Sequence, residues 1–182
     1  AIERSTAKQF ERLEKAIDDA DWNLVEKLIS QNPELLTKVQ QRRSSLLFEA
    51  ITNNRPDIAE RLIASGASPH YQDKNGTTAL MLASKKGYLS LAEKLIQKGA
   101  VVNQQRNDGW TALMCAAKSG HLEMVELLIQ NEASVHLESE RHSALTIAAR
   151  NGHLDVAVLL IYKGSPVNAT PPDGWNALMF AA

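Results

Sequence analysis

Two histidines in matching surroundings are the strongest candidates for metal chemistry in this sequence. His121 and His153 each follow a glycine and lie 32 residues apart, at the same position of two successive repeated units. A zinc ion needs each of its nitrogen ligands at about 2 Å. Packed helical units lie about 10 Å apart, so two equivalent turn residues do not reach one ion. We therefore interpret both histidines as turn residues that hydrogen-bond to neighbouring loops, and we predict no metal site.

Cys115 is the single cysteine and the most reactive side chain available for covalent catalysis. It lies between Met114 and Ala116 in an apolar stretch, where a free thiol behaves as a small hydrophobic group, so we expect a core residue. The sequence contains no phosphate-binding Gly-Lys-Ser/Thr loop, no nucleophile elbow and no His-Glu-x-x-His pattern. We predict that this segment has no catalytic residues and no cofactor and is not an enzyme.

The elements that position these residues follow from an internal repeat. An Ala-Leu-containing stretch begins at Ala79 and returns at Ala112, Ala144 and Ala177, in steps of 33, 32 and 33 residues. A period in this range indicates small supersecondary units, each of which buries its apolar face only against its neighbours. Such an array presents an extended surface, which suits partner binding better than chemistry in a closed pocket.

Each unit has the signals of two helices joined by a turn. Thr78, Thr111 and Ser143 stand where a helix N-cap oxygen is needed, and Asn176 can do the same in the last unit. Glycines at 87, 120 and 152 end the inner helix, where a left-handed residue is required, and Asn54 is the tolerated substitute. Apolar pairs then recur at helical spacing along the outer helix.

The repeats resemble the ankyrin family, whose unit is a loop or β-hairpin followed by two antiparallel helices. The resemblance covers nearly the whole chain and implies an all-α repeat solenoid of stacked helix-turn-helix units joined by hairpin loops. We expect five repeats, the first degenerate, and the start of a sixth, at about residues 6–39, 40–72, 73–105, 106–137, 138–170 and 171–182. Because the last unit lacks its outer helix, we expect the natural protein to continue.

This sequence departs from the family pattern in two ways. The family's Thr-Pro-Leu-His tetrad reads Thr-Ala-Leu-Met at residues 78–81 and 111–114. The loop at residues 138–142 is one residue shorter than the others and has Arg141 where they have glycine, so we expect a distorted hairpin tip.

The resemblance also implies where a partner binds. In ankyrin proteins, residue identity is free just before the N-cap and in the two residues before the inner-helix glycine, and these positions face the concave groove. Trp is the residue type most enriched at binding hot spots, although a Trp at this position can also simply cover the adjacent hairpin. The lysines and arginine form a basic row, which either recognises an acidic partner or is only a solvated face. The candidate partner-binding residues are Trp110, Trp175, Thr77, His142, Lys85, Lys86, Lys118, Ser119, Arg150 and Asn151.

The resemblance implies a protein–protein interaction scaffold that binds a partner, with an acidic or apolar anchor segment, through the concave groove. The alternative is a substrate-targeting segment of a larger enzyme or bacterial-type effector, whose catalytic domain lies after residue 182. A net charge of −1 argues against nucleic acid, and the sequence has no apolar run long enough to span a membrane. A single cysteine fits a reducing compartment. We expect a cytoplasmic protein, in the producing cell or, for an effector, in a host cell; the oligomeric state stays open.

Overall fold

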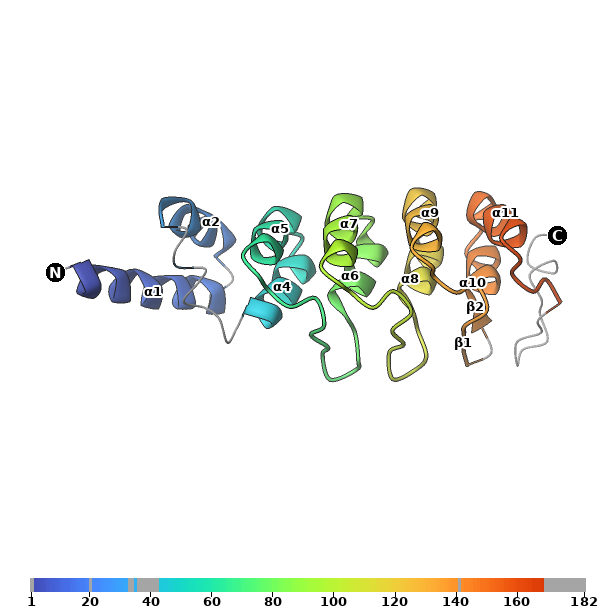
Figure 1. The fold of residues 1–182 in the computed structure, drawn as a ribbon, viewed down its shortest axis with the longest axis horizontal. Coiled ribbons are helices and arrows are strands. Elements are labelled where there is room, and N and C mark those ends of the chain that lie inside the picture. The colour runs from blue at the N-terminus through green and yellow to red at the C-terminus, as the bar shows by residue number, and fades with distance from the viewer. Residues whose placement is uncertain (1, 20, 33–34, 36–42, 141, 169–182) are drawn as a thin grey trace. The chain divides into compact units, whose positions relative to one another are not determined.

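The chain folds into two compact helical units, Ala1–Ser68 and Pro69–Ala182. The computed structural model describes residues 2–19, 21–32, 35, 43–140 and 142–168. Helices dominate both units, and successive helices fold back as antiparallel pairs (Figure 1). The all-α repeat solenoid expected from the sequence is therefore confirmed.

The first unit contains two helix pairs. α1 (Ile2–Asp18) packs on α2 (Trp22–Gln31), and α4 (Arg43–Thr52) packs on α5 (Pro56–Ala64). α1 begins at Ile2, four residues before the start that we expected for the first repeat. The side chains that hold this unit together are apolar and almost fully buried: Leu13, Val25, Leu28, Leu47, Ile51, Ile58 and Leu62.

An arginine joins the two helix pairs of the first unit. Arg55, the residue before α5, lies with a guanidinium nitrogen 2.7 Å from a carboxylate oxygen of Glu26 on α2 and 2.7 Å from one of Asp57. The Arg55 hydrogen bond is the main reason that the pKa of Asp57 is lowered, with burial acting in the opposite direction. The planar guanidinium suits such a role because it bonds two carboxylates at once.

The described part of the second unit contains three helix pairs. The inner helices are α6 (Ala79–Lys86), α8 (Ala112–Ser119) and α10 (Ala144–Arg150), and α8 packs between the other two. The outer helices are α7 (Leu89–Gln97), α9 (Leu122–Gln130) and α11 (Leu154–Tyr162), in the same order (Figure 1). Leu80, Leu91, Leu95, Leu113, Leu128, Leu145 and Leu160 fill the core between the layers.

The predicted N-caps of the inner helices are confirmed, as are the glycine C-caps of α6 and α8. The prediction for Gly152 is off by one residue, because α10 has Asn151 as its C-cap and the left-handed Gly152, with a φ of +76°, follows it. The side-chain oxygens of Thr78, Thr111 and Ser143 accept hydrogen bonds from the third helical N–H at 3.2, 3.3 and 3.2 Å. Gly87 and Gly120 close α6 and α8 with φ angles of 73° and 71°, which is the left-handed conformation that glycine adopts without penalty. The cap of Asn176 lies outside the described residues.

The loops of the second unit are hairpin-like. In the short third loop, β1 (Glu138–Ser139) pairs antiparallel with β2 (His142–Ser143), so that Ser139 lies opposite His142. We expected a distorted hairpin tip. The strand residues on either side pair regularly, and at the tip Glu140 takes a φ of +47°, a left-handed conformation that is uncommon for a residue other than glycine. Arg141 lies outside the described residues.

Candidate partner-binding groove

Trp110 is the residue around which the candidate site is built. It directly precedes Thr111, the N-cap of α8, and its backbone N–H donates to Oδ1 of Asp108 at 3.3 Å. The Asp108 side chain therefore organises the turn that presents the indole. Trp110 itself is half-buried, so part of its ring stays available to a ligand.

Two cations lie against the Trp110 ring. The Arg106 guanidinium carbon is 5.8 Å from the ring centroid and the Lys118 ammonium nitrogen is 5.4 Å from it. Cations at this distance are attracted by the negative face of the aromatic ring. They hold the indole in place and surround an apolar surface with positive charge.

Arg106 is held in its position by a carboxylate. It donates two hydrogen bonds to Asp108, one of them at 2.8 Å, and this contact is the main reason that the pKa of Asp108 lies below its usual value. The Asp108 backbone oxygen in turn accepts a hydrogen bond from the hydroxyl of Ser139 in β1. The loop before α8 and the hairpin before α10 are thus joined two residues before Trp110.

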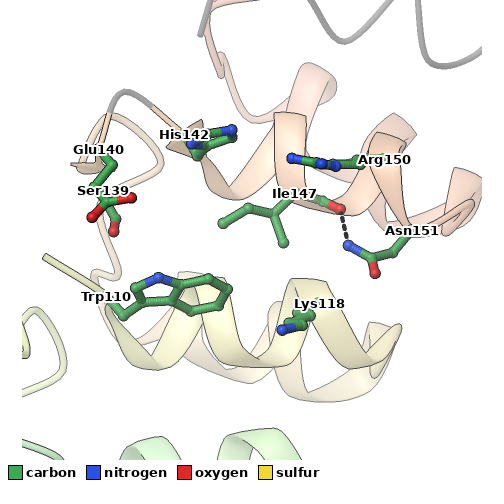
Figure 2. A pocket seen from close by; sticks show the side chains of 8 residues that line it. All are labelled: Trp110, Lys118, Ser139, Glu140, His142, Ile147, Arg150 and Asn151. Atoms are coloured by element: carbon green, nitrogen blue, oxygen red, sulfur yellow. Dashed lines mark hydrogen bonds between the residues drawn. The ribbon is translucent and has the colours of Figure 1, made fainter. Parts of the chain in front are cut away.

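A groove with a volume of about 410 Å³ lies between these two loops and the inner helices α8 and α10. We call it the Trp110 groove, and it is lined by Trp110, Lys118, Ser139, Glu140, His142, Ile147, Arg150 and Asn151. Figure 2 shows the hairpin residues Ser139, Glu140 and His142 closing one end, with Arg150 and Asn151 at the other. Asn151 is oriented by a 2.7 Å hydrogen bond from its amide to the Ile147 carbonyl oxygen.

The groove combines one apolar surface with several polar groups. Trp110 and Ile147 lie next to each other and supply the apolar part (Figure 2). His142 adds a buried Nε2 that, among the described residues, makes no hydrogen bond. The charged lining groups are Lys118, Arg150 and Glu140, so cations outnumber the carboxylate. Such a surface suits an apolar side chain accompanied by an acidic one.

Half of the predicted binding residues meet in this groove: Trp110, Lys118, His142, Arg150 and Asn151. Ser119 is half-buried at the end of α8 and does not line it. Lys85 and Lys86 lie on α6, in the preceding helix pair, and Lys85 is exposed. Trp175 falls outside the described residues.

Thr77 requires a correction. Its side chain is only 8% exposed, and its backbone N–H is held by Oδ1 of Asp73 at 2.8 Å. Asp73 also accepts from the Asn75 N–H at 2.9 Å. Burial acts to raise the pKa of Asp73. The hydrogen bonds from these N–H groups lower it by a larger amount, so the pKa lies below its usual value. Thr77 therefore lies within a folded turn rather than on a contact surface.

The turn histidines form hydrogen bonds between repeats as predicted, although their partners lie at the ends of inner helices and not in loops. His121 Nε2 lies 3.2 Å from the Lys85 carbonyl oxygen, and His153 Nε2 lies 3.0 Å from that of Lys118. Each ring therefore hydrogen-bonds to the inner helix of the helix pair before its own. Among the described residues, no cluster of three or more His, Cys, Asp or Glu side chains is arranged to hold a metal ion.

Cys115 differs from the sequence-based expectation. It is only partly buried on α8, and not in the fully buried core. Burial raises the pKa of the Cys115 thiol to about 11, although the nearby cation Arg106 acts to lower it. A thiol with such a pKa is almost entirely protonated near neutral pH, which disfavours a nucleophilic role.

Sequence reasoning missed Arg106, Ser139, Glu140 and Ile147. Arg106 could have been found from the Arg-x-Asp-x-Trp spacing of the loop, because a guanidinium two residues from a carboxylate can pair with it. Glu140 and Ser139 enter the site because the short loop becomes a strand pair. Ile147 is equivalent to Cys115 on the preceding inner helix, and no sequence signal separates the two.

Comparison with known proteins agrees with this architecture. A family model described as ankyrin repeats in three copies matches residues 13–106, 47–139 and 88–171. The chain belongs to the ankyrin repeat family, whose repeats are generally protein–protein interaction modules. Among curated proteins it is similar to the human (Homo sapiens) 2-5A-dependent ribonuclease, with 33% identity over 88 residues. That match covers 48% of this chain and 12% of the ribonuclease.

Proposed function

We propose that this chain is an interaction scaffold that binds a partner protein through the concave face formed by its inner helices and hairpins, with the Trp110 groove at the centre of contact. The observation that carries the proposal is the half-buried indole between Arg106 and Lys118 at the edge of a 410 Å³ groove. Aromatic and arginine side chains in partly desolvated pockets supply most of the energy in protein interfaces.

The chemistry of the lining indicates the kind of partner. An apolar side chain fits against Trp110 and Ile147, while a neighbouring carboxylate meets Lys118 or Arg150. Lys85 and Lys86 extend the positive charge onto α6. We place this interaction inside the cell, since a single cysteine cannot form an internal disulfide. Among the described residues, no helix is long and apolar enough to cross a membrane.

Affinity capture with the 182-residue chain tests the proposal. Partners recovered with the unaltered chain and lost with Trp110→Ala support it. Glu93→Lys on α7 is the matched control, because Glu93 is an exposed residue of an outer helix, away from the groove. Retention of the same partners by Trp110→Ala, together with their loss from the Glu93→Lys control, would show that the contact lies on the other face.

A second candidate is a substrate-targeting segment of a larger enzyme or effector. The similarity to a ribonuclease, of which the matched segment is a small part, favours it. The full-length coding sequence, followed by activity assays of any domain beyond residue 182, is the test. An uninterrupted series of further repeats with no other domain would count against this candidate.

A third candidate function is binding of a small anionic ligand. The cations beside the Trp110 ring favour it, and so does the name of the ribonuclease, which says that this enzyme depends on 2-5A. Titration of the chain with 2-5A, followed by tryptophan fluorescence, tests it. A saturable change that disappears in Trp110→Phe supports a ligand in the groove. No change across the titration excludes 2-5A and leaves the protein partner as the better explanation.

A further inference from the structure

The helix α11 carries an exposed apolar stripe. Leu154, Val158, Ile161 and Tyr162 are 59%, 66%, 42% and 82% exposed, and we call these four residues the α11 stripe. Their spacing of four, three and one residues places them on one face of the helix. Other large hydrophobic side chains with comparable exposure among the described residues, Tyr71 and Val101, lie in loops and stand alone.

Two of the four stripe positions are polar in the other outer helices, whereas the first and eighth positions are Leu and Ile in all three. α7, α9 and α11 each have nine residues, so their positions correspond directly. The fifth position is Glu93 in α7 and Glu126 in α9, but Val158 in α11. The ninth is Gln97 in α7 and Gln130 in α9, but Tyr162 in α11. Two polar residues of the outer face are thus replaced by apolar ones in this helix.

The exposure of Val158 and Tyr162 does not depend on whether another helix pair follows α11. α7 and α9 each have a following outer helix packed against them, and still Glu93, Gln97, Glu126 and Gln130 are all exposed. A further repeat that stacks in the same way leaves positions five and nine open to solvent. These two side chains therefore stay available to a different surface.

The charges on α11 indicate what that surface is. Asp155 lies in the first turn of the helix, and Lys163 is its C-cap residue, with its ammonium 5.7 Å from the centroid of the Tyr162 ring. When two copies of such a helix lie antiparallel about a two-fold axis, each Asp155 faces the Lys163 end of the other. The pattern is self-complementary, as an interface between identical chains must be.

We propose that the α11 stripe is a docking surface for a second copy of this chain, which packs its own α11 antiparallel against it. Val158 lies at the centre of the pair, Leu154 of each copy lies near Tyr162 of the other, and the two Asp155–Lys163 contacts fix the orientation. This surface lies on an outer helix, so dimerisation is independent of the Trp110 groove and of what binds there.

The expected association is weak. A standard stable interface buries about 1,600 Å² in total, and a single pair of nine-residue helices offers less than this. We therefore expect a monomer–dimer equilibrium with a Kd in the micromolar range. Two copies joined in this way present two Trp110 grooves, which raises the avidity for a partner that carries two binding segments.

Sedimentation equilibrium of the 182-residue chain across the micromolar range is the test. The unaltered chain should shift toward twice its monomer mass as its concentration rises. Val158→Glu with Tyr162→Gln gives α11 the residue types found in α7 and α9, and should weaken dimerisation at least tenfold. Glu93→Gln on α7 is the matched control and should dimerise as the unaltered chain does.

The charge contacts give a second and sharper readout. Asp155→Lys should weaken the dimer because it places like charges together, and the exchange Asp155→Lys with Lys163→Asp should restore it. Circular dichroism verifies folding of each variant, and Tyr162→Gln alone replaces the double variant if that one does not fold. The proposal is overturned if the unaltered chain stays monomeric throughout, or if the stripe variants dimerise as strongly as the unaltered chain.

Discussion

His153 Nε2 lies 3.0 Å from the backbone carbonyl oxygen of Lys118, so that the turn of one helix pair bonds to the inner helix of the pair before it. The same ring covers Gly120, because a Cβ added to that glycine would lie 2.4 Å from His153 Nδ1. His121 repeats the arrangement over Gly87. A glycine and the histidine of the next unit therefore act as one structural element, which links successive repeats.

We predict that Gly120→Ala and His153→Ala are coupled. Gly120→Ala introduces both a clash with the ring and a left-handed alanine, and should cost about 2–3 kcal/mol of the free energy of unfolding. His153→Ala should cost about 1–2 kcal/mol through its lost hydrogen bond and packing. Because removal of the ring also removes the clash, the double variant should lose less than the sum. Chemical denaturation of all four proteins measures this; strict additivity would contradict the coupling.

Trp110→Ala should weaken binding of a captured partner by about 2 kcal/mol, or roughly 30-fold, because it removes a rigid aromatic anchor from a partly desolvated site. Isothermal titration calorimetry measures the change. The free energy of unfolding should change little, because Trp110 is only half-buried and lies outside the apolar core. Unchanged affinity would exclude the Trp110 groove as the contact.

Lys85→Glu combined with Lys118→Glu should act mainly on the association rate. Exposed charges steer an acidic partner toward the surface more than they hold it there. Stopped-flow measurements at increasing salt concentration should show slower association and a flatter salt dependence than for the unaltered chain. Glu93→Lys on α7 should leave both quantities nearly unchanged.

The Cys115 thiol should react slowly with an alkylating reagent while the protein is folded. Its pKa of about 11, against an ordinary value of 9.0, reduces the thiolate fraction near pH 8 by about 100-fold. Labelling in the native state and in denaturant, followed by mass spectrometry, tests this. Equal rates in the two states would show that the thiol is neither buried nor electrostatically suppressed.

Acid should loosen the loops before α6 and α8. The pKa values of Asp73 and Asp108 are lowered in the folded state, so the stabilisation that these carboxylates give is complete above their unfolded pKa of about 3.9. It is lost as the pH falls through the lower folded values. Thermal melts below about pH 4 should therefore show a smaller loss for Asp73→Asn with Asp108→Asn than for the unaltered chain. Parallel loss in both proteins would assign the acid sensitivity to other groups.

The helical architecture was predictable because its signals are local. The N-caps Thr78, Thr111 and Ser143 and the left-handed Gly87 and Gly120 act within one turn of chain, and all five behave as the sequence predicts. The turn histidines were also predictable, because they recur at the repeat period and contact an equivalent partner each time.

The depth of individual side chains was less predictable. Thr77 and Trp110 occupy the same position of successive repeats, yet Thr77 is buried and Trp110 is half-buried. Likewise Cys115 is partly exposed while its equivalent Ile147 is buried. Repeat position fixes the direction of a side chain, whereas its exposure depends on side-chain size and on the neighbouring loop. Contacts between loops, such as that of Ser139 with Asp108, depend on the conformation of both loops, and they produce no periodic pattern in the sequence.

Hydrogen bonds connect each loop of the second unit to the next repeat. The Asn107 N–H bonds to the Asn75 carbonyl oxygen at 2.9 Å, its amide bonds to the Lys74 carbonyl oxygen at 3.1 Å, and the Asn103 amide bonds to the Glu132 carbonyl oxygen at 2.9 Å. Each of these hydrogen bonds joins a repeat only to its neighbour. Under tension, load therefore passes through one junction after another, and the weakest yields first while the rest hold. This part of the chain should therefore unfold one repeat at a time under tension, and refold one repeat at a time when the tension is released.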